Sequence, residues 1–358
     1  MNEDCLKLTC YFGERHRSGG RFVADRLLDI YGRSEIAASI MLRGVEGFGL
    51  KHHLRSDSSL TLSEDLPAVA IAVDSRARIE SILDEVAGIE NVGLVTLERA
   101  RLIQGDIGPL ALPESLHEAT KLTIYLGRQE RVYRVPAYIG VCDLLHRRGI
   151  AGATVLLGVD GTRHGQRERA LFFGRNVEVP MMVMAIGSGR SITRVLPELG
   201  ALLRDPLISL ERVRICKRDG ELLERPHDLP GTDEHGMALW QKLSIITSAA
   251  AQHQGQPIYR AITRQLRATG MSGATSLRGI WGFHGDHAPH GDRPLQVGRH
   301  VPTLTIVIDT PERAAAAFPI TDALTTEHGL IISEMVPALH ARASDHRRGG
   351  LRLASHHY

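Results

Sequence analysis

Apolar and polar side chains alternate along several short segments of this chain. The alternation covers residues 6–12 and returns at residues 121–126, and a period of two is typical of a β-strand with one buried face. A different spacing follows, in which Ile79, Ile82 and Val86 lie on one side of a predicted helix. The pattern therefore predicts strands and amphipathic helices in succession. The helix predicted at residues 314–318 is expected to be broken early by Pro319.

A glycine-containing stretch occurs three times, as Gly44-Val45-Glu46-Gly47, Gly158-Val159-Asp160-Gly161 and Gly279-Ile280-Trp281-Gly282. The interval from Lys7 to Lys121 equals the interval from Gly44 to Gly158, and a second equal pair of intervals leads to Lys242 and Gly279. The repeat is longer than those of solenoids and propellers. The chain is therefore predicted to carry three tandem copies of one domain.

Within one copy the predicted order is strand, helix, strand, strand, helix, strand, with a long loop between the second and third strands. This order predicts an α+β fold with a ferredoxin-like unit, in which an antiparallel sheet carries both helices on one face. We expect the bare faces of the three sheets to meet inside an intramolecular pseudo-trimer, because exposed sheet faces and edges favour aggregation. The alternative is three independent domains on flexible linkers.

The repeats set the expected domain limits. The predicted divisions are a first repeat at 1–103, a linker at 104–118, a second repeat at 119–216, a linker at 217–238, a third repeat at 239–340 and a basic, disordered tail at 341–358.

Composition narrows the class of protein. The 358 residues contain no apolar run of the roughly 18 residues that span a bilayer, and the first residues lack the features of a secretory signal, so we expect a cytoplasmic protein. A net charge of +2 gives no reason to expect nucleic acid as a partner. The four cysteines have no paired spacing, which predicts free thiols.

The glycine stretches and the loops after them are candidate ligand sites. Glycine allows a ligand to approach the backbone closely, although a bulge or kink in the strand explains it equally well. The loops are longer than ordinary hairpin connections and carry cationic or titratable groups suited to an anion; a solvated surface is the alternative. The candidates are Gly44, Gly47, Lys51, His52, Gly158, Gly161, Arg163, His164, Gly279, Gly282 and His284.

Other chemistry receives less support from the sequence. His284, Asp286, His287 and His290 could gather a metal ion, but this pattern occurs in one loop only. Common nucleophile, phosphate-loop and zinc-protease motifs are missing, so we predict a non-catalytic protein. The recurring glutamates at the strand ends, Glu98, Glu211 and Glu334, are predicted to be structural, and the lysine of each first strand is predicted to pack or form ion pairs on the inner sheet face.

The stretches Ala151–Gly161, Ser272–Gly282 and Met41–Gly49 resemble the signature of an uncharacterised PII-like family. The resemblance covers nearly all of each repeat. It implies the ferredoxin-like fold shared by PII and CutA proteins, and a trimer that is here encoded in one chain. It also implies that small effectors bind in clefts between neighbouring units.

In PII proteins a Gly-Phe-Gly sequence lines the nucleotide cleft, and Gly47-Phe48-Gly49 is similar to it. The second repeat has Thr162-Arg163 and the third has Phe283-His284 at the corresponding positions, so we do not expect three equivalent sites. Arginines after the last strand are similar to the phosphate-binding arginines of PII proteins; these are Arg99, Arg101, Arg212 and Arg214.

Together these features predict a regulatory protein that binds a small anionic effector, with an adenine nucleotide as the implied candidate. The long loops would then control a protein partner such as a membrane transporter. The alternatives are a metal- or cation-responsive protein, similar to CutA, that uses the His284–His290 loop, and an enzyme of unrecognised type.

Overall fold

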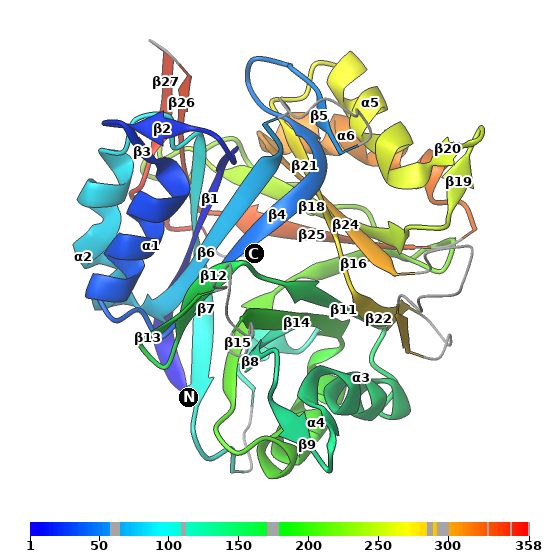
Figure 1. Cartoon of the computed structure of the whole chain (residues 1–358). Coiled ribbons are helices and arrows are strands. Elements are labelled where there is room, and N and C mark those ends of the chain that lie inside the picture. The colour runs from blue at the N-terminus through cyan, green and yellow to red at the C-terminus, as the bar shows by residue number, and fades with distance from the viewer. Residues whose placement is uncertain are drawn as a thin grey trace.

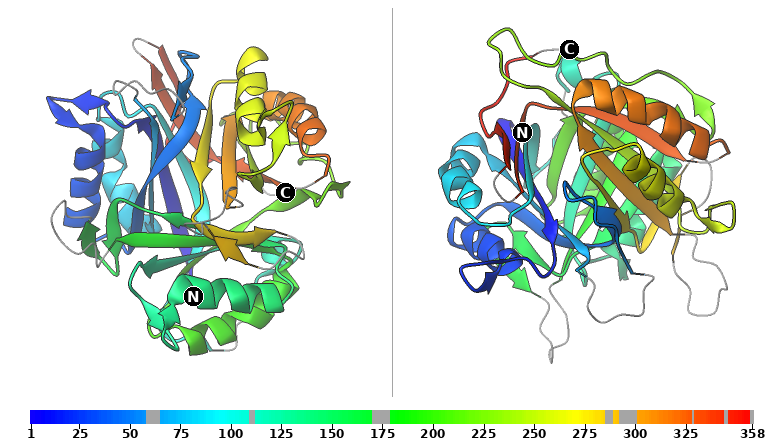
Figure 2. Two further views of the ribbon diagram at one scale, coloured as in Figure 1. Left: turned by 45° about the vertical axis from the view of Figure 1, so that its right-hand side comes forward. Right: turned by 90° about the horizontal axis from the view of Figure 1, so that it is seen from above.

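The computed structural model describes residues 1–57, 65–108, 112–169, 179–284, 289–291, 301–327, 329–343 and 346–356. Across these residues the chain has a mixed α/β fold with six α-helices and a large, curled, antiparallel sheet. Three pairs of helices lie on the outside, and the main strands converge in the middle (Figures 1 and 2). The predicted α+β class and the three tandem copies are thus confirmed.

The first repeat contains two helices and four main strands. Its elements are β1 (Asn2–Gly13), the small hairpin β2 (Arg17–Ser18) and β3 (Arg21–Phe22), α1 (Val23–Arg33), β4 (Ala38–Phe48), β5 (Arg55–Ser56), β6 (Pro67–Ser75), α2 (Arg76–Ala87) and β7 (Leu94–Gln104).

The second repeat has the same order, after a short 3-10 turn at Glu114–Leu116. Its elements are β8 (Thr120–Gly127), β9 (Arg131–Val132), β10 (Val135–Pro136), α3 (Ala137–Arg147), β11 (Gly152–Leu157), β12 (Asp160–Arg163), β13 (Gln166–Arg169), β14 (Pro180–Gly187), α4 (Gly189–Leu202), β15 (Leu207–Arg212), β16 (Arg214–Arg218) and β17 (Glu221–Leu222).

The third repeat repeats the order and adds a terminal hairpin. Its elements are β18 (Trp240–Ser248), β19 (Gln252–His253), β20 (Gln256–Pro257), α5 (Ile258–Ala268), β21 (Ala274–Arg278), β22 (Trp281–His284), β23 (His290–Gly291), β24 (Pro302–Asp309), α6 (Pro311–Leu324), β25 (Leu330–Val336), β26 (Ala338–Ala343) and β27 (His346–Gly350).

Within the first repeat the strands lie in the order β4-β6-β1-β7, and every neighbouring pair is antiparallel. The central strand β6 is almost wholly apolar because both of its faces are covered. One face packs on α1 and α2, where Leu8, Leu27 and Ile79 belong to a single buried cluster. The second and third repeats have corresponding clusters beneath their own helices.

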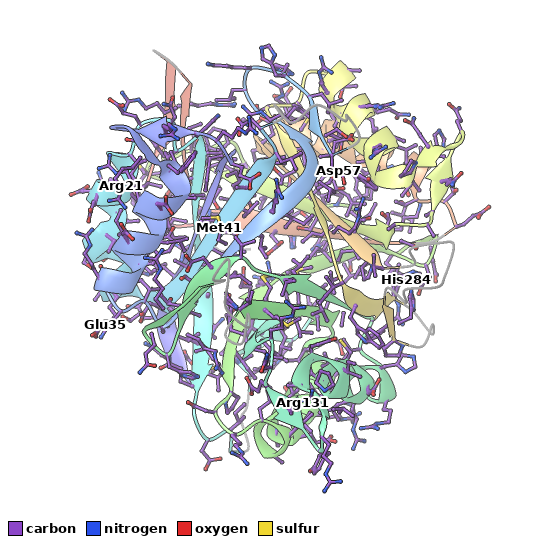
Figure 3. The ribbon with its side chains drawn as sticks, in the orientation of Figure 1. Arg21, Glu35, Met41, Asp57, Arg131 and His284 are labelled. Carbon is purple, nitrogen blue, oxygen red and sulfur yellow. The ribbon has the colours of Figure 1, made fainter. Side chains whose placement is uncertain are left out.

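The opposite faces of the sheets also meet one another. Ile40, Met182 and Leu304, from three different repeats, belong to one shared buried cluster. Figure 3 shows the difference between interior and periphery: Met41, in the cluster beneath α1 and α2, lies inside, whereas Arg21, Glu35 and Arg131 lie at the periphery. The described residues therefore show a common interior and do not form three independent domains.

Strand pairing connects the repeats in a cycle. The end of β4 in the first repeat pairs with β21 of the third, β22 of the third pairs with β11 of the second, and β12 of the second pairs with the start of β4. Three further pairings cross between repeats. The end of β7 in the first repeat pairs with β15 of the second, β16 of the second pairs with β25 of the third, and β26 of the third pairs with β7 of the first. Each repeat is thus joined to both of the others.

Two predictions from the sequence differ from the structure. The tail expected to be disordered from residue 341 instead forms the hairpin of β26 and β27, because β7 offers β26 a free edge. The helix expected to break at Pro319 continues to Leu324, because Pro319 lies on its exposed side. In the described part of the chain, no helix is long and apolar enough to cross a membrane.

Candidate functional site

The recurring glycines lie where one repeat meets the next. A Cβ atom at Gly47 would lie 2.6 Å from the carbonyl oxygen of Ala274. The corresponding distance is shorter still at Gly161, from the carbonyl oxygen of Ser39, and at Gly282, from that of Ala153. All three carbonyls belong to a neighbouring repeat. Side chains larger than hydrogen would separate these strands, so the second glycine of each stretch is required for pairing between repeats.

The first glycine of each stretch has a different neighbour. Gly44, Gly158 and Gly279 lie against the proline that opens the third main strand of their own repeat, and a Cβ at Gly44 would lie 2.6 Å from Cγ of Pro67. The repeated glycine pattern is therefore explained by close backbone packing. It does not by itself indicate a ligand at all three positions.

A cavity of about 560 Å³ lies at the junction of the first and third repeats. Four of the predicted site residues line it, namely Gly47, Phe48, Gly49 and Lys51. The volume falls within the range of about 300–1,000 Å³ that holds small molecules. The cleft that the sequence predicted from Gly47-Phe48-Gly49 is thus present at this junction.

The cavity has an apolar wall and a cationic rim. The apolar residues are Tyr11, Phe12, Phe48, Pro67, Leu94, Trp240, Ile306, Ile308 and Leu339, and the cationic or titratable ones are Arg15, His16, Arg17, Lys51, His53, Arg55, Arg342 and Arg348. Asp309 is the acidic residue among those that line it. This distribution suits a molecule with an apolar or aromatic body and an anionic group.

Arg348 of the terminal hairpin is held in place over the cavity. Its guanidinium lies 4.5 Å from the ring centroid of Trp240, and Nη1 donates to the hydroxyl of Ser272 at 3.3 Å. The same nitrogen lies 3.7 Å from Asp309 Oδ1. A cation fixed in this way is ready to receive an anion without losing further side-chain entropy.

On the other side of the cavity, Arg55 and His16 both lie close to the carboxylate of Asp65. Arg55 Nη2 lies 3.0 Å from Asp65 Oδ2, and His16 Nε2 lies 3.5 Å from the same oxygen. Asp65 also accepts from the backbone amide of Arg15 at 2.7 Å. Asp65 therefore orients this part of the rim.

His52 lies near the cavity but does not line it. Its ring stacks on Phe48 with centroids 5.8 Å apart, and its backbone amide donates to the carbonyl of Gly49 at 2.7 Å. The residue adopts a positive φ of 52°. His52 therefore closes the turn after the glycine stretch and covers Phe48 from outside.

The arginines that resemble phosphate-binding residues are not brought to the cavity. Arg99 donates to the carbonyl of Ala354 at 2.6 Å. The pKa of Arg99 is lowered, mainly by burial and to a smaller extent by the positive charge of Arg76. Arg214 lies 3.1 Å from Glu224, and Arg212 lies 4.0 Å from Glu118. Neither these three nor Arg101 is among the described residues that line the cavity.

The candidate residues of the second and third loops contact other side chains of the protein. Arg163 Nη1 lies 3.0 Å from Glu130, and His164 Nε2 lies 3.3 Å from Asp205. His284 is buried and its Nδ1 lies 3.8 Å from Asp219. Phe283 packs edge-on against His146 at 5.1 Å. These residues lie at the other two junctions, so the structure separates them from the cavity.

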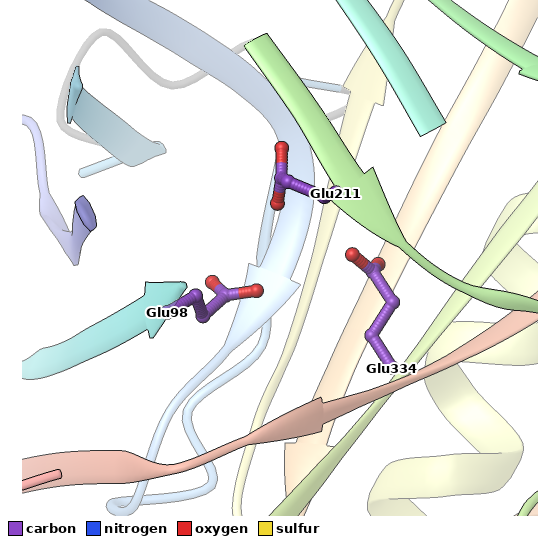
Figure 4. A group of neighbouring side chains, drawn as sticks. All are labelled: Glu98, Glu211 and Glu334. Atoms are coloured by element: carbon purple, nitrogen blue, oxygen red, sulfur yellow. The ribbon is translucent and has the colours of Figure 1, made fainter. Parts of the chain in front are cut away.

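The proposed metal loop is only partly described. Asp286 and His287 lie outside the described residues, and His290 pairs with Gly282 through β23. Among the described residues, one group of three potential ligands has its ligand atoms within 4.8 Å of one another, and it consists of Glu98, Glu211 and Glu334 (Figure 4).

These three glutamates belong to a buried ring of charges. Lys7 pairs with Glu211 and with Glu98 at 3.4 Å, Lys121 with Glu334 and with Glu211 at 3.0 Å, and Lys242 with Glu98 and with Glu334 at 3.3 Å. Of the two roles predicted for the lysines, packing or ion pairing, the structure thus shows ion pairing. Three ammonium groups balance three carboxylates, so the ring joins the repeats and leaves no excess charge for a metal ion.

Sequence reasoning missed Trp240, Arg348 and the end of β1. They line the same cavity as Gly49 because β26 pairs with β7 and β21 pairs with β4. The signals available in the sequence were one of two tryptophans, at the start of a strand, and an arginine-rich tail.

Fold and cavity together define a tandem-repeat α/β protein with a ligand-sized cleft between two of its repeats. A family model matches the chain three times, at residues 5–102, 119–215 and 240–338. These matches cover most of the chain, which therefore belongs to the family DUF190, described as "Uncharacterized ACR, COG1993".

Proposed function

We propose that this protein is a non-catalytic, PII-like regulator that binds a nucleotide-like anion in the cleft between its first and third repeats. The strand order β4-β6-β1-β7 supports a ferredoxin-like unit. The cyclic pairing of β4, β21, β22, β11 and β12 supports an intramolecular pseudo-trimer. In that arrangement a cleft between units is a natural place for an effector.

One observation carries the choice of ligand: the cavity combines an aromatic and aliphatic wall with a rim rich in arginine, lysine and histidine. An adenine ring fits the wall of Phe48 and Trp240, and phosphate groups fit the guanidinium groups of the rim, which bind phosphate oxygens in pairs. Ordering of the loop after Gly49 on binding would then change the surface offered to a partner protein, such as a transporter, in the cytoplasm.

Trp240 provides a direct test. The chain has two tryptophans, and Trp281→Phe leaves Trp240 as the reporter in the cavity. We expect ATP to change its fluorescence in a saturable manner and to raise the melting temperature, because a ligand that binds only the folded state stabilises it. Arg348→Ala should weaken ATP binding roughly tenfold, since a charge-assisted hydrogen bond contributes about 1.5–3 kcal/mol.

Arg131→Ala is the matched control, because Arg131 lies on the exposed β9 of the second repeat, far from the cavity lining. It should bind ATP as the wild type does. If ATP, ADP and AMP at millimolar concentration leave both fluorescence and melting temperature unchanged, the proposed effector class is wrong.

A further inference from the structure

The three junctions between repeats differ at one position. Gly49 follows Gly47 at the same interval as Arg163 follows Gly161 and His284 follows Gly282. These three residues are thus equivalent by position in the repeat. Their side chains decide what occupies the space at the end of each glycine stretch.

At the junction of the first and third repeats this space is open. A Cβ atom on Gly49 would meet no atom of the described residues within 4 Å, and Gly49 lines the cavity of about 560 Å³. The opposite rim carries Arg342, which is exposed and whose backbone amide donates to the carbonyl of Gly93 at 3.1 Å. The cleft therefore has room and a cation facing it.

At the junction of the first and second repeats, a side chain of the protein takes the equivalent place. Arg163 extends over Gly127, where a Cβ would lie 3.3 Å from its Nη2, and it pairs with Glu130 at 3.0 Å. Gly127 corresponds to Gly13, which lines the open cavity and has the Arg55–Asp65 pair against it. The two junctions thus differ in the residue that carries the guanidinium: at the position equivalent to Gly49 the second repeat has Arg163, paired with Glu130.

At the junction of the second and third repeats, the equivalent residue is His284, whose side chain is 10% exposed and lies 3.8 Å from Asp219. Asp219 follows Glu211 at the same interval as Arg342 follows Glu334. Its amide donates to Gly329 at 2.8 Å, as that of Arg342 does to Gly93. An acid thus replaces the cation of the open cleft, and an imidazole fills the space left by glycine.

We infer that the chain has one effector site, at Gly49, and that Arg163 with Glu130 and His284 with Asp219 close the two equivalent clefts. This inference rests on the proposed function and specifies its stoichiometry. An assembly of three identical units would bind three effectors, whereas this chain binds one. Fusion of the repeats allows such divergence, because each junction is encoded separately.

Isothermal titration of the full-length protein with ATP tests the inference. We expect one ATP per chain for the wild type. Gly49→Arg, which copies the second repeat, should reduce affinity at least tenfold. The double variant Gly49→His/Arg342→Asp copies the third junction and should do the same. Gly108→Arg is the matched control, because Gly108 is exposed and, among the described residues, no atom lies within 4 Å of a Cβ placed there.

Arg163→Ala separates a closing residue from a ligand-binding one. The variant should bind ATP with wild-type affinity at the Gly49 site, with one or two ATP per chain, since removal of the closing side chain either leaves that cleft incompetent or opens it. Melting temperatures near that of the wild type establish that each variant is folded.

The outcomes distinguish the two proposals. Two or three ATP per wild-type chain, undiminished binding by folded Gly49→Arg, or loss of binding in Arg163→Ala would overturn the single site while leaving an ATP-binding regulator in place. Absence of ATP binding by the wild type would overturn the proposed function and this inference with it.

Discussion

Six charged side chains at the centre of the molecule show how strongly single residues depend on their partners. Burial alone would raise the pKa of Glu98, but the ammonium groups of Lys242 and Lys7 outweigh it and hold that pKa well below the ordinary value of 4.5. The pKa of Glu211 is lowered against burial in the same way by Lys121 and Lys7. Both carboxylates are therefore ionised in the folded protein at neutral pH.

The pH dependence follows from the sign of these shifts. A carboxyl group whose folded pKa is depressed contributes stability that is fully present above its unfolded pKa and is lost as pH falls through the folded value. The lysines act at the other limit, because the carboxylates outweigh burial and raise the pKa of Lys7 above 10.5. The ring is thus expected to stabilise the fold between about pH 4.5 and 10.5.

Glu98→Gln tests the ring at the residue scale. At pH 7 we expect a loss of about 3–5 kcal/mol in the free energy of unfolding, because the change leaves buried ammonium groups without their counter-charge. The difference from the wild type should begin to shrink below pH 4.5, where the Glu98 carboxyl of the unfolded chain becomes protonated, and should disappear only as pH falls through the depressed pKa of the folded state. Urea unfolding at several pH values measures it. Glu80→Gln, in an exposed pair with Arg76, should behave like the wild type, and a constant difference across pH would contradict the account.

Elements of the structure are joined through strands that pair across repeats. The pairing of β12 with β4 brings Gly161 opposite Ile40 and Thr162 opposite Ser39. Thr162 donates its backbone amide to the hydroxyl of Ser39 at 2.9 Å and its own hydroxyl to the carbonyl of Ile36 at 2.7 Å. These contacts require the backbone to approach as closely as glycine permits.

Gly161→Val should therefore loosen this junction. The added side chain collides with the carbonyl of Ser39, and overpacking of this kind costs about 1–3 kcal/mol. Hydrogen exchange should accelerate in β12 and in the first half of β4. Gly231→Val provides the control, because Gly231 is exposed and a Cβ placed there would have no atom within 4 Å in the described part of the chain. Unchanged exchange in β12 would show that the pairing is not needed for stability.

At the scale of the whole molecule, three similar units share one interior. Their apolar sheet faces meet in a common cluster, and the charge ring crosses all three repeats. The terminal hairpin extends the third repeat across β7 of the first, which brings Arg342 and Arg348 to the cleft that the end of β1 also lines. The candidate site is therefore a property of the assembled chain and not of one repeat.

Small-angle scattering tests this arrangement. A chain of 358 residues folded into one body should have a radius of gyration of about 21 Å and should elute as a monomer. Independent domains joined by the linkers would give a clearly larger radius. That result would exclude the shared interior and, with it, the cleft between the first and third repeats.

The sequence by itself determined the unit and its multiplicity. Alternating strands, helical spacing and the constant intervals between Lys7, Lys121 and Lys242 are local signals, so they predicted the order of elements in every copy. Gly47-Phe48-Gly49 was also predicted as part of a cleft. Its local pattern alone left open whether the glycines serve a ligand or the backbone.

Only the tertiary structure decided which cleft is open and what surrounds it. Trp240, Arg348 and the end of β1 approach Gly49 because strands far apart in the sequence pair with one another, and no local pattern encodes that contact. Likewise, Arg163 and His284 were candidate ligand residues in the sequence, whereas their partners Glu130 and Asp219 are identified only in three dimensions. Residue types set the available chemistry, but long-range packing assigns each group its partner.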